Sequence, residues 1–186
     1  INNKNFIEIL LKNLSRFNFT KAILLCHYKG SIFYKKYQNK KIKGLYVKCI
    51  IEKKALGTLG SLLNAKKKLD QFFLLSNGDT FFDINIADLY KKFNYKKSLL
   101  LLAAGKIITD DKYRYQNFLI KKGILKKIFY STSKNQIINS GLCIVNKKIL
   151  KSVNKKDVSF DKNLIQSLIP TKKVQVEIYN KKFIDI

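Results

Sequence analysis

The sequence is poor in several residue types on which many catalytic and structural sites depend. It has a single histidine, His27, so a histidine-based metal site or a Ser-His-Asp triad would rest on that residue alone. Its three cysteines have no C-x-x-C spacing, and two of them end apolar strand-like runs, which indicates reduced, buried thiols of a cytoplasmic protein. The longest apolar run, 99–104, is far shorter than the about 20 residues that a membrane-spanning helix needs, so we expect no membrane partner.

Arginine and acidic residues are also scarce. The chain has 38 Lys and Arg against 12 Asp and Glu, a formal net charge of +26, yet only Arg16 and Arg114 are arginines. A dedicated nucleic-acid surface more often uses arginine and clusters its charges, whereas these lysines are spread along the whole chain. We therefore interpret the charge as a compositional bias and expect no specific nucleic-acid partner. A basic nucleic-acid-binding module remains an alternative, which a linear fall of log affinity with log salt would support.

The 186 residues, 46% of them hydrophobic, suit one globular domain spanning 1–186, because no internal repeat, low-complexity tract or linker interrupts them. Helical and strand-like patterns alternate with short connections, which is typical of an α/β layer fold. Lys122-Gly123 predicts a hairpin that adds antiparallel pairing. The expected helices span 6–17, 31–37, 58–69, 86–93 and 160–168; the expected strands span 22–26, 45–51, 72–77, 98–104, 117–121, 124–130, 137–145, 174–179 and 183–186.

The most informative motif is the apolar run 72–75 followed by Ser76-Asn77-Gly78-Asp79. Such a run predicts a buried strand, and ligands of open α/β sheets lie outside the carboxyl ends of their strands. Asp79 would lie at that edge, and Gly78 would allow a metal ion or a phosphate to approach the backbone closely. The alternative is an ordinary Asn-Gly-Asp turn that caps the next helix.

A second motif, Leu56-Gly57-Thr58-Leu59-Gly60, follows the expected strand 45–51 and opens the expected helix 58–69. The unpaired N–H groups and the positive end of the dipole at a helix N-terminus favour an anion or the polar edge of a base. Alternatively, Thr58 is simply the N-cap and the glycines are simply loop residues.

Taken in order, these motifs resemble the sugar-phosphate nucleotidyltransferase family, most closely its D-glycero-D-manno-heptose 1-phosphate and mannose-1-phosphate guanylyltransferase branches. The resemblance covers nearly the whole chain, and the order of the motifs is highly specific for the family. The segments that carry it are Asn2 to Glu8, Glu52 with Leu56 to Gly60, Leu75 to Asp83, Arg114-Tyr115, Ile138 to Gly141, Ser159 to Lys162, and Phe183 to Ile186.

The resemblance implies a Rossmann-like nucleotidyltransferase layer fold with a mixed, mostly parallel central sheet. It also implies transfer from a nucleoside triphosphate, GTP in the branches named, to a sugar 1-phosphate, giving a nucleotide sugar for surface polysaccharide synthesis and pyrophosphate. By similarity, Asp79 and Asp185 are the catalytic residues and hold Mg²⁺. The other implied site residues are Glu52, Leu56, Gly57, Thr58, Gly60 and Gly78, with Asp79, for the nucleotide, and Tyr115, Asn139, Gly141 and Asp161 for the sugar.

Some features depart from the family pattern. The chain begins just beyond the family's Gly-rich loop and Pro-Lys-Pro segment and stops before its closing helix, so we expect a part of an enzyme, incomplete at both ends, with little activity alone. Gln116 stands where relatives usually have glycine, and the family's Glu-Lys is replaced near Ser131 and Thr132, with Lys134 as the candidate substitute.

Three further alternatives stay open at this point. A glucose-1-phosphate thymidylyltransferase would use the same motifs for another base and sugar. A glycosyltransferase of the related nucleotide-sugar fold would use Asp79 with Asp83 as its metal ligands, although the Leu-Gly-Thr-x-Gly element argues against it. An oligomer is compatible with the sequence as well as a monomer.

Overall fold

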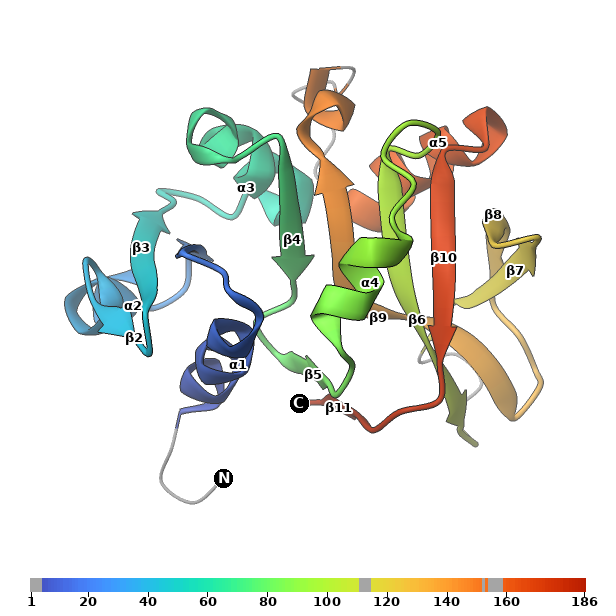
Figure 1. Cartoon of the computed structure of the whole chain (residues 1–186), viewed down its shortest axis with the longest axis horizontal. Coiled ribbons are helices and arrows are strands. Elements are labelled where there is room, and N and C mark those ends of the chain that lie inside the picture. The colour runs from blue at the N-terminus through green and yellow to red at the C-terminus, as the bar shows by residue number, and fades with distance from the viewer. Residues whose placement is uncertain (1–4, 111–114, 152, 154–158) are drawn as a thin grey trace. The chain divides into compact units, whose positions relative to one another are not determined.

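The computed structural model describes residues 5–110, 115–151, 153 and 159–186, and the chain divides into two compact units. The first unit comprises Ile1–Lys68 and Lys155–Ser159, and the second comprises Leu69–Asn154 and Phe160–Ile186. In Figure 1 the elements of the first unit are blue to cyan, and those of the second run from green to red. The interpretation of residues 1–186 as a single domain stays a prediction.

The first unit has a three-stranded sheet in the order β1-β3-β2. Strand β1 is parallel to β3, and β2 forms an antiparallel hairpin with β3 through Lys43 and Gly44. Both turn residues have positive φ, 46° and 89°, the backbone that a tight hairpin requires. The elements are α1 (Phe6–Leu14), η1 (Ser15–Phe17), β1 (Lys21–Cys26), α2 (Gly30–Tyr37), β2 (Lys41–Ile42), β3 (Leu45–Ile51), α3 (Gly57–Ala65) and η2 (Lys66–Lys68).

The core of the first unit follows from the alternation of β3. Leu45, Val47 and Cys49 are buried at every second position, and they pack with Leu11 of α1 and Tyr37 of α2. Asn5 is the N-cap residue of α1, but its side chain makes no capping bond; instead its Nδ2 donates to the hydroxyl of Tyr37 at 3.3 Å.

The second unit contains the remaining elements, which begin after η2. They are β4 (Phe72–Ser76), β5 (Thr80–Phe82), α4 (Ile86–Lys92), β6 (Leu100–Ile108), β7 (Asn117–Lys121), β8 (Ile124–Phe129), β9 (Asn135–Asn146), η3 (Lys147–Lys151), the π-helix η4 (Phe160–Ile165), α5 (Gln166–Leu168), η5 (Ile169–Thr171), β10 (Val174–Tyr179) and β11 (Phe183–Asp185).

The main sheet of the second unit has the order β4-β9-β6-β10-β8-β7, and β7 also pairs with β9. The sheet is mixed, as expected, but the expectation that it is mostly parallel is wrong. Among the strands described in this sheet, only β6 and β10 pair in parallel, while β9 runs antiparallel to both β4 and β6. The continuous apolar run of β6, whose residues Leu100 to Ala104 are fully buried, reflects its central position between β9 and β10, of which only β10 is parallel to it.

A β-bulge interrupts the pairing of β6 with β9. Ala103 pairs with Leu142 and Ala104 with Asn139, so Ser140 and Gly141 are extra residues on β9. The buried hydroxyl of Ser140 donates to the carbonyl oxygen of Ala103 at 2.8 Å, which satisfies a group beside the interrupted ladder. Bulges re-aim side chains near functional sites, and this one lies where two of the expected sugar-site residues stand.

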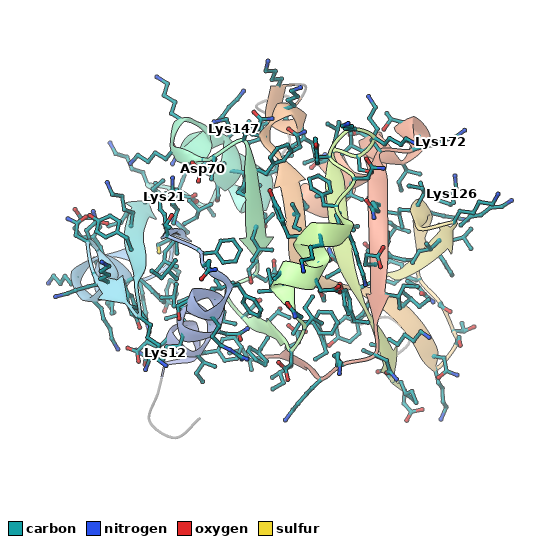
Figure 2. All side chains as sticks on the ribbon, in the orientation of Figure 1. Lys12, Lys21, Asp70, Lys126, Lys147 and Lys172 are labelled. Carbon is teal, nitrogen blue, oxygen red and sulfur yellow. The ribbon has the colours of Figure 1, made fainter. Side chains whose placement is uncertain are left out.

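The lysines are distributed over both units. Those labelled in Figure 2 extend from α1 (Lys12), β1 (Lys21), β8 (Lys126), η3 (Lys147) and the end of η5 (Lys172). This wide distribution agrees with lysines that fill solvated positions. The three cysteines are free and buried, as expected. Within the described residues, no helix is long and apolar enough to cross a bilayer.

Candidate functional site

The Asn77-Gly78-Asp79 loop leads into a strand and does not cap a helix. The main-chain N–H of Asn77 donates to the carbonyl oxygen of Gly141 at 2.9 Å, so the loop is tied to the bulge of β9. Asp79 is exposed, and β5 begins at the next residue. Helix α4 starts later and has its own cap, since Oδ1 of Asn85 accepts from the N–H of Asp88. The turn-and-cap interpretation of this motif is therefore wrong.

Pairing of β5 with β11 brings the two predicted metal ligands to one hydroxyl. Thr80 lies opposite Asp185 in this antiparallel pair, and the N–H of Ile186 donates to the carbonyl oxygen of Asp79 at 3.2 Å. The Oγ1 atom of Thr80 lies 3.1 Å from Oδ1 of Asp79 and 3.5 Å from Oδ1 of Asp185. Two acids separated by about half of the chain thus meet at the buried Thr80, as the resemblance implies.

The donor set of Asp79 and Asp185 fits a hard divalent cation. Mg²⁺ is usually held by one or two carboxylates, with substrate phosphates and water completing its octahedral shell. No group of three or more His, Cys, Asp or Glu side chains is gathered among the residues that the structure describes, so the protein's share would be these two carboxylates. Asp83 does not fit as a partner, because the extended β5 separates its Cα from that of Asp79 by about 13 Å at about 3.3 Å per residue.

Tyr115, expected on the sugar side, lies against the acid pair. Its hydroxyl donates to Oδ2 of Asp185 at 3.1 Å. Its ring packs edge-on against Phe183 of β11, with ring centroids 6.1 Å apart, and Phe183 packs in the same way against Phe82 of β5. Arg114, the other half of this motif, and the N-terminal segment 2–4 lie outside the described residues.

Asn139 and Asp161, both expected at the sugar, form a hydrogen-bonded pair. Nδ2 of Asn139 donates to Oδ1 of Asp161 at 3.1 Å, and Oδ1 of Asn139 accepts from the N–H of Gly141 at 3.1 Å. Asp161 stands in the first turn of the π-helix η4, an element found frequently at functional sites. Burial raises the pKa of the Asp161 carboxyl above its ordinary value, while the bond from Asn139 acts in the opposite direction.

The fold requires glycine at one of two positions in the second unit, Gly141, but not at the other, Gly78. Gly141 has φ +70°, and a Cβ added there would lie 2.6 Å from Nδ2 of Asn77, so the fold itself requires glycine. A Cβ added to Gly78 would meet nothing within 4 Å, so the fold does not require it. The open space beside Gly78 agrees with its expected place next to a ligand.

In the first unit, α3 begins at Gly57, whose φ is +67°. Thr58 lies in the first turn and is not the N-cap; the N-cap is Leu56, which makes no side-chain capping bond. Gly57 and Thr58 are exposed, so their orphan N–H groups are accessible to an anion or a polar base edge. Gly60 faces Leu56, whose Cβ lies 3.0 Å from the position of an added Cβ, which explains the second glycine by close packing.

Glu52 lies between β3 and α3 and is almost fully buried, with 7% of its surface exposed. Its main chain is fixed, since its N–H donates to the carbonyl oxygen of Cys26 at 2.8 Å and its own carbonyl oxygen lies 3.2 Å from Nδ1 of His27. Its side-chain Oε1, in contrast, is buried and has no hydrogen-bond partner in the described part of the chain. A buried carboxylate oxygen without a donor is energetically unfavourable, and native structures usually supply a partner for such an atom.

The structure thus brings together Asp79, Asp185 and Tyr115 in one group, and Asn139, Gly141 and Asp161 in another. Sequence reasoning missed Thr80, because only the pairing of β5 with β11 reveals its position between two acids. The candidate Lys134 makes an exposed ion pair with Asp110, with Nζ 2.6 Å from Oδ1, and Oγ of the nearby Ser131 accepts from the N–H of Ser133. Roles for Lys134, Ser131, Thr132 and Gln116 in the site stay predictions.

Comparison with solved structures shows the same fold in several relatives. HddC from Yersinia pseudotuberculosis superposes with a TM-score of 0.85 at 25% identity, over 98% of this chain and 80% of that chain. The same protein complexed with GMP-PN gives a TM-score of 0.80 at 26% identity, with the same coverage. The inositol-1-phosphate CTP transferase from T. maritima, at 18% identity, has a TM-score of 0.78 over 100% of this chain and 78% of that chain, which shows the fold alone.

Sequence comparison agrees with the fold. D-glycero-alpha-D-manno-heptose 1-phosphate guanylyltransferase of Campylobacter jejuni is 28% identical over 189 residues, which cover 100% of this chain and 82% of that protein. A family model described as nucleotidyl transferase matches residues 1–183. With the motif order, the fold and this match in agreement, the chain belongs to the nucleotidyl transferase family.

Proposed function

We propose that this chain forms the catalytic part of a magnesium-dependent guanylyltransferase that joins GMP from GTP to a sugar 1-phosphate, with heptose 1-phosphate as the favoured sugar. The observation that carries the proposal is the convergence of Asp79 and Asp185 on Thr80 at the β5–β11 pair. It supplies two oxygen ligands for a cation at the end of a family motif. The similarity to a heptose 1-phosphate guanylyltransferase and to HddC supports the choice of base and sugar.

In this reaction an oxygen of the sugar 1-phosphate attacks the α-phosphorus of the nucleotide. A new P–O bond forms, the bond between the α-phosphorus and the bridging oxygen breaks, and pyrophosphate leaves with that electron pair. The protein's task is to hold two anions in line and to neutralise their charge, because no covalent intermediate is needed. Bound Mg²⁺ would supply charge neutralisation at the phosphates, and Asp79 and Asp185 would hold it.

Glu52 supports the choice of guanine as the base. The Watson–Crick edge of guanine presents two adjacent donors, the N1–H and the exocyclic amino group, and a carboxylate accepts both. For this pairing Glu52 offers Oε1, a buried oxygen without a hydrogen-bond partner among the described residues, at the end of β3 and just before the N-terminus of α3. Adenine, uracil and cytosine lack that pair of donors in that arrangement. HddC has been crystallised with GMP-PN, which agrees with a guanine site in that relative.

The sugar side is assigned to Asn139, Gly141 and Asp161. The pair of Asn139 and Asp161 presents an amide and a carboxylate, which together can donate to and accept from vicinal sugar hydroxyls. The half-buried position of Asp161 strengthens such bonds, because the lower local dielectric reduces competition from water.

The proposal is tested by pyrophosphate release from GTP and a sugar 1-phosphate, measured on the full gene product with heptose, mannose and glucose 1-phosphates and with each nucleoside triphosphate. Asp79→Asn and Asp185→Asn should each abolish the Mg²⁺-dependent release while the melting temperature is retained. Asp83→Asn, which removes an exposed acid at the other end of β5, is the matched control and should leave turnover unchanged. Wild-type turnover in either of the first two variants would refute the assigned roles.

A further inference from the structure

We infer that the hydroxyl groups of Thr80 and Tyr115 are positioning groups for the cation site, so that Tyr115 acts through Asp185 rather than on the sugar. This inference rests on the proposed function, because it assigns a task within the cation site proposed there. Neither hydroxyl would touch the cation. Each would fix the carboxylate that does.

The contacts of Asp185 support this assignment. Its Oδ1 lies 3.5 Å from Oγ1 of Thr80, and its Oδ2 accepts from the hydroxyl of Tyr115 at 3.1 Å, so both oxygens face a hydroxyl group. The bond from Tyr115 to one oxygen and the contact of the other oxygen with Thr80 together restrict rotation of this carboxylate about its Cβ–Cγ bond.

The hydroxyl of Thr80 is shared between the two acids. It carries one proton, and the shorter contact, 3.1 Å, is to Oδ1 of Asp79. Thr80 is buried on β5 and held by the β5–β11 ladder opposite Asp185. Its Oγ1 therefore has a fixed position, and both carboxylates lie against it. Groups of this kind, which orient the ligands of a metal without binding it, typically change metal affinity 10–100-fold when they are removed.

Tyr115 is itself held by aromatic packing. Its ring meets Phe183 edge-on, and Phe183 meets the buried Phe82 edge-on, with ring centroids 6.1 Å and 6.0 Å apart. This row of rings connects the two strands of the β5–β11 pair to the tyrosine. The phenol therefore reaches Asp185 from a ring with restricted freedom, which lowers the entropy that its hydrogen bond must overcome.

The test measures binding of Mn²⁺ alone, in place of Mg²⁺, to the chain by electron paramagnetic resonance, in which free and bound Mn²⁺ give different signals. Thr80→Val and Tyr115→Phe remove one hydroxyl each with little change of shape, and each should weaken Mn²⁺ binding by about tenfold or more. Thr80→Ser keeps the hydroxyl and should restore the affinity. The melting temperature without metal should change little in all three variants, whereas a purely structural role would lower it.

Two controls match these changes. Tyr179→Phe removes a phenol that bonds Oδ2 of Asp88 at 3.4 Å, and Thr171→Val removes a hydroxyl that donates to the carbonyl oxygen of Leu168 at 2.7 Å. Neither should alter Mn²⁺ affinity. If Asp79→Asn and Asp185→Asn weaken Mn²⁺ binding but Thr80→Val and Tyr115→Phe do not, the positioning role is overturned and the proposed cation site stands. If the two Asn variants bind Mn²⁺ as the wild type does, the cation site itself is wrong and the inference fails with it.

Discussion

The main-chain N–H of Asn77 donates to the carbonyl oxygen of Gly141, 2.9 Å away. This single bond joins the loop that carries Asp79 to the bulge that carries Asn139. The acid expected to hold a cation and the amide expected to bind a sugar are therefore positioned by one shared piece of backbone. A substitution that moves the backbone at Asn77 or at Gly141 should therefore also shift the residue at the other end of the bond.

Gly141→Ala should destabilise the second unit by about 1–3 kcal/mol, because it forces a side chain into a left-handed conformation and against Asn77. Gly78→Ala is the matched control and should change stability by less than about 0.5 kcal/mol, since its Cβ meets open space. Denaturant unfolding of both variants checks the pair. Equal stability of the two would mean that Asn77 moves aside at little cost.

Glu52→Gln should reduce affinity for GTP about tenfold or more. The amide replaces one carboxylate oxygen by an NH₂ group, which cannot accept a hydrogen bond from guanine. The preference for GTP over ATP should fall with it. Calorimetric titration above about 0.3 M salt, where screening suppresses the nonspecific attraction of +26 charges for any triphosphate, measures both. Glu177→Gln, with the same change of charge at a partly exposed ion pair with Lys92, should leave the preference unchanged.

Asp161→Asn should stabilise the folded chain at neutral pH. Burial raises the pKa of Asp161 above its ordinary 3.8, so the folded state binds the proton more tightly than the unfolded state does. The protonated Asp161 carboxyl therefore adds to the wild-type free energy of unfolding below its ordinary pKa, and this contribution is lost as pH rises through the raised pKa of the folded state. The melting temperature of the variant minus that of the wild type should increase with pH across this window and then become constant. A difference that does not depend on pH would contradict the assignment.

The three thiols should react slowly with a disulfide reagent in the native chain. Cys26, Cys49 and Cys143 are buried, and burial raises the pKa of Cys26 to about 11, so at pH 8 only about a thousandth of that thiol is the reactive thiolate. Absorbance of the released thiolate should rise quickly to three equivalents only after denaturation. A fast equivalent in the native state would reveal an opening near one of these strands.

Much of the fold could be predicted from the sequence, because its elements follow local patterns. Strand β3 alternates buried and exposed residues, and β4 is an apolar run that ends where the Asn-Gly turn begins. The expected helix 58–69 begins one residue earlier, at Gly57, and is regular only to Ala65, after which lysines 66–68 form a 3₁₀ turn. The expected helix 160–168 does end at Leu168, the last residue of α5. Pro170 then lies within a 3₁₀ turn, Ile169–Thr171, that follows directly.

What could not be predicted depends on pairing between distant segments. Strand β5 has only three residues, too few for a periodic signal, and it is a strand because β11 pairs with it. The antiparallel directions of β9 relative to β4 and β6 are equally invisible in local patterns, which made a mostly parallel sheet the expectation. The carboxylates Asp79 and Asp185 were matched by motif, but the hydroxyls of Thr80 and Tyr115 between and beside them needed coordinates.

The β5–β11 pair also has a consequence for the order in which the second unit folds and unfolds. Thr80 and Asp185 are 105 positions apart in the chain, and the two-stranded ladder that joins them is three residues long. Closing so long a loop has a high entropic cost. The short ladder forms only a few hydrogen bonds to offset that cost. We therefore expect this ladder to close late in folding and to open locally while the six-stranded sheet stays intact. The chemistry of the acid pair would then vanish at temperatures where spectroscopy still reports a folded protein.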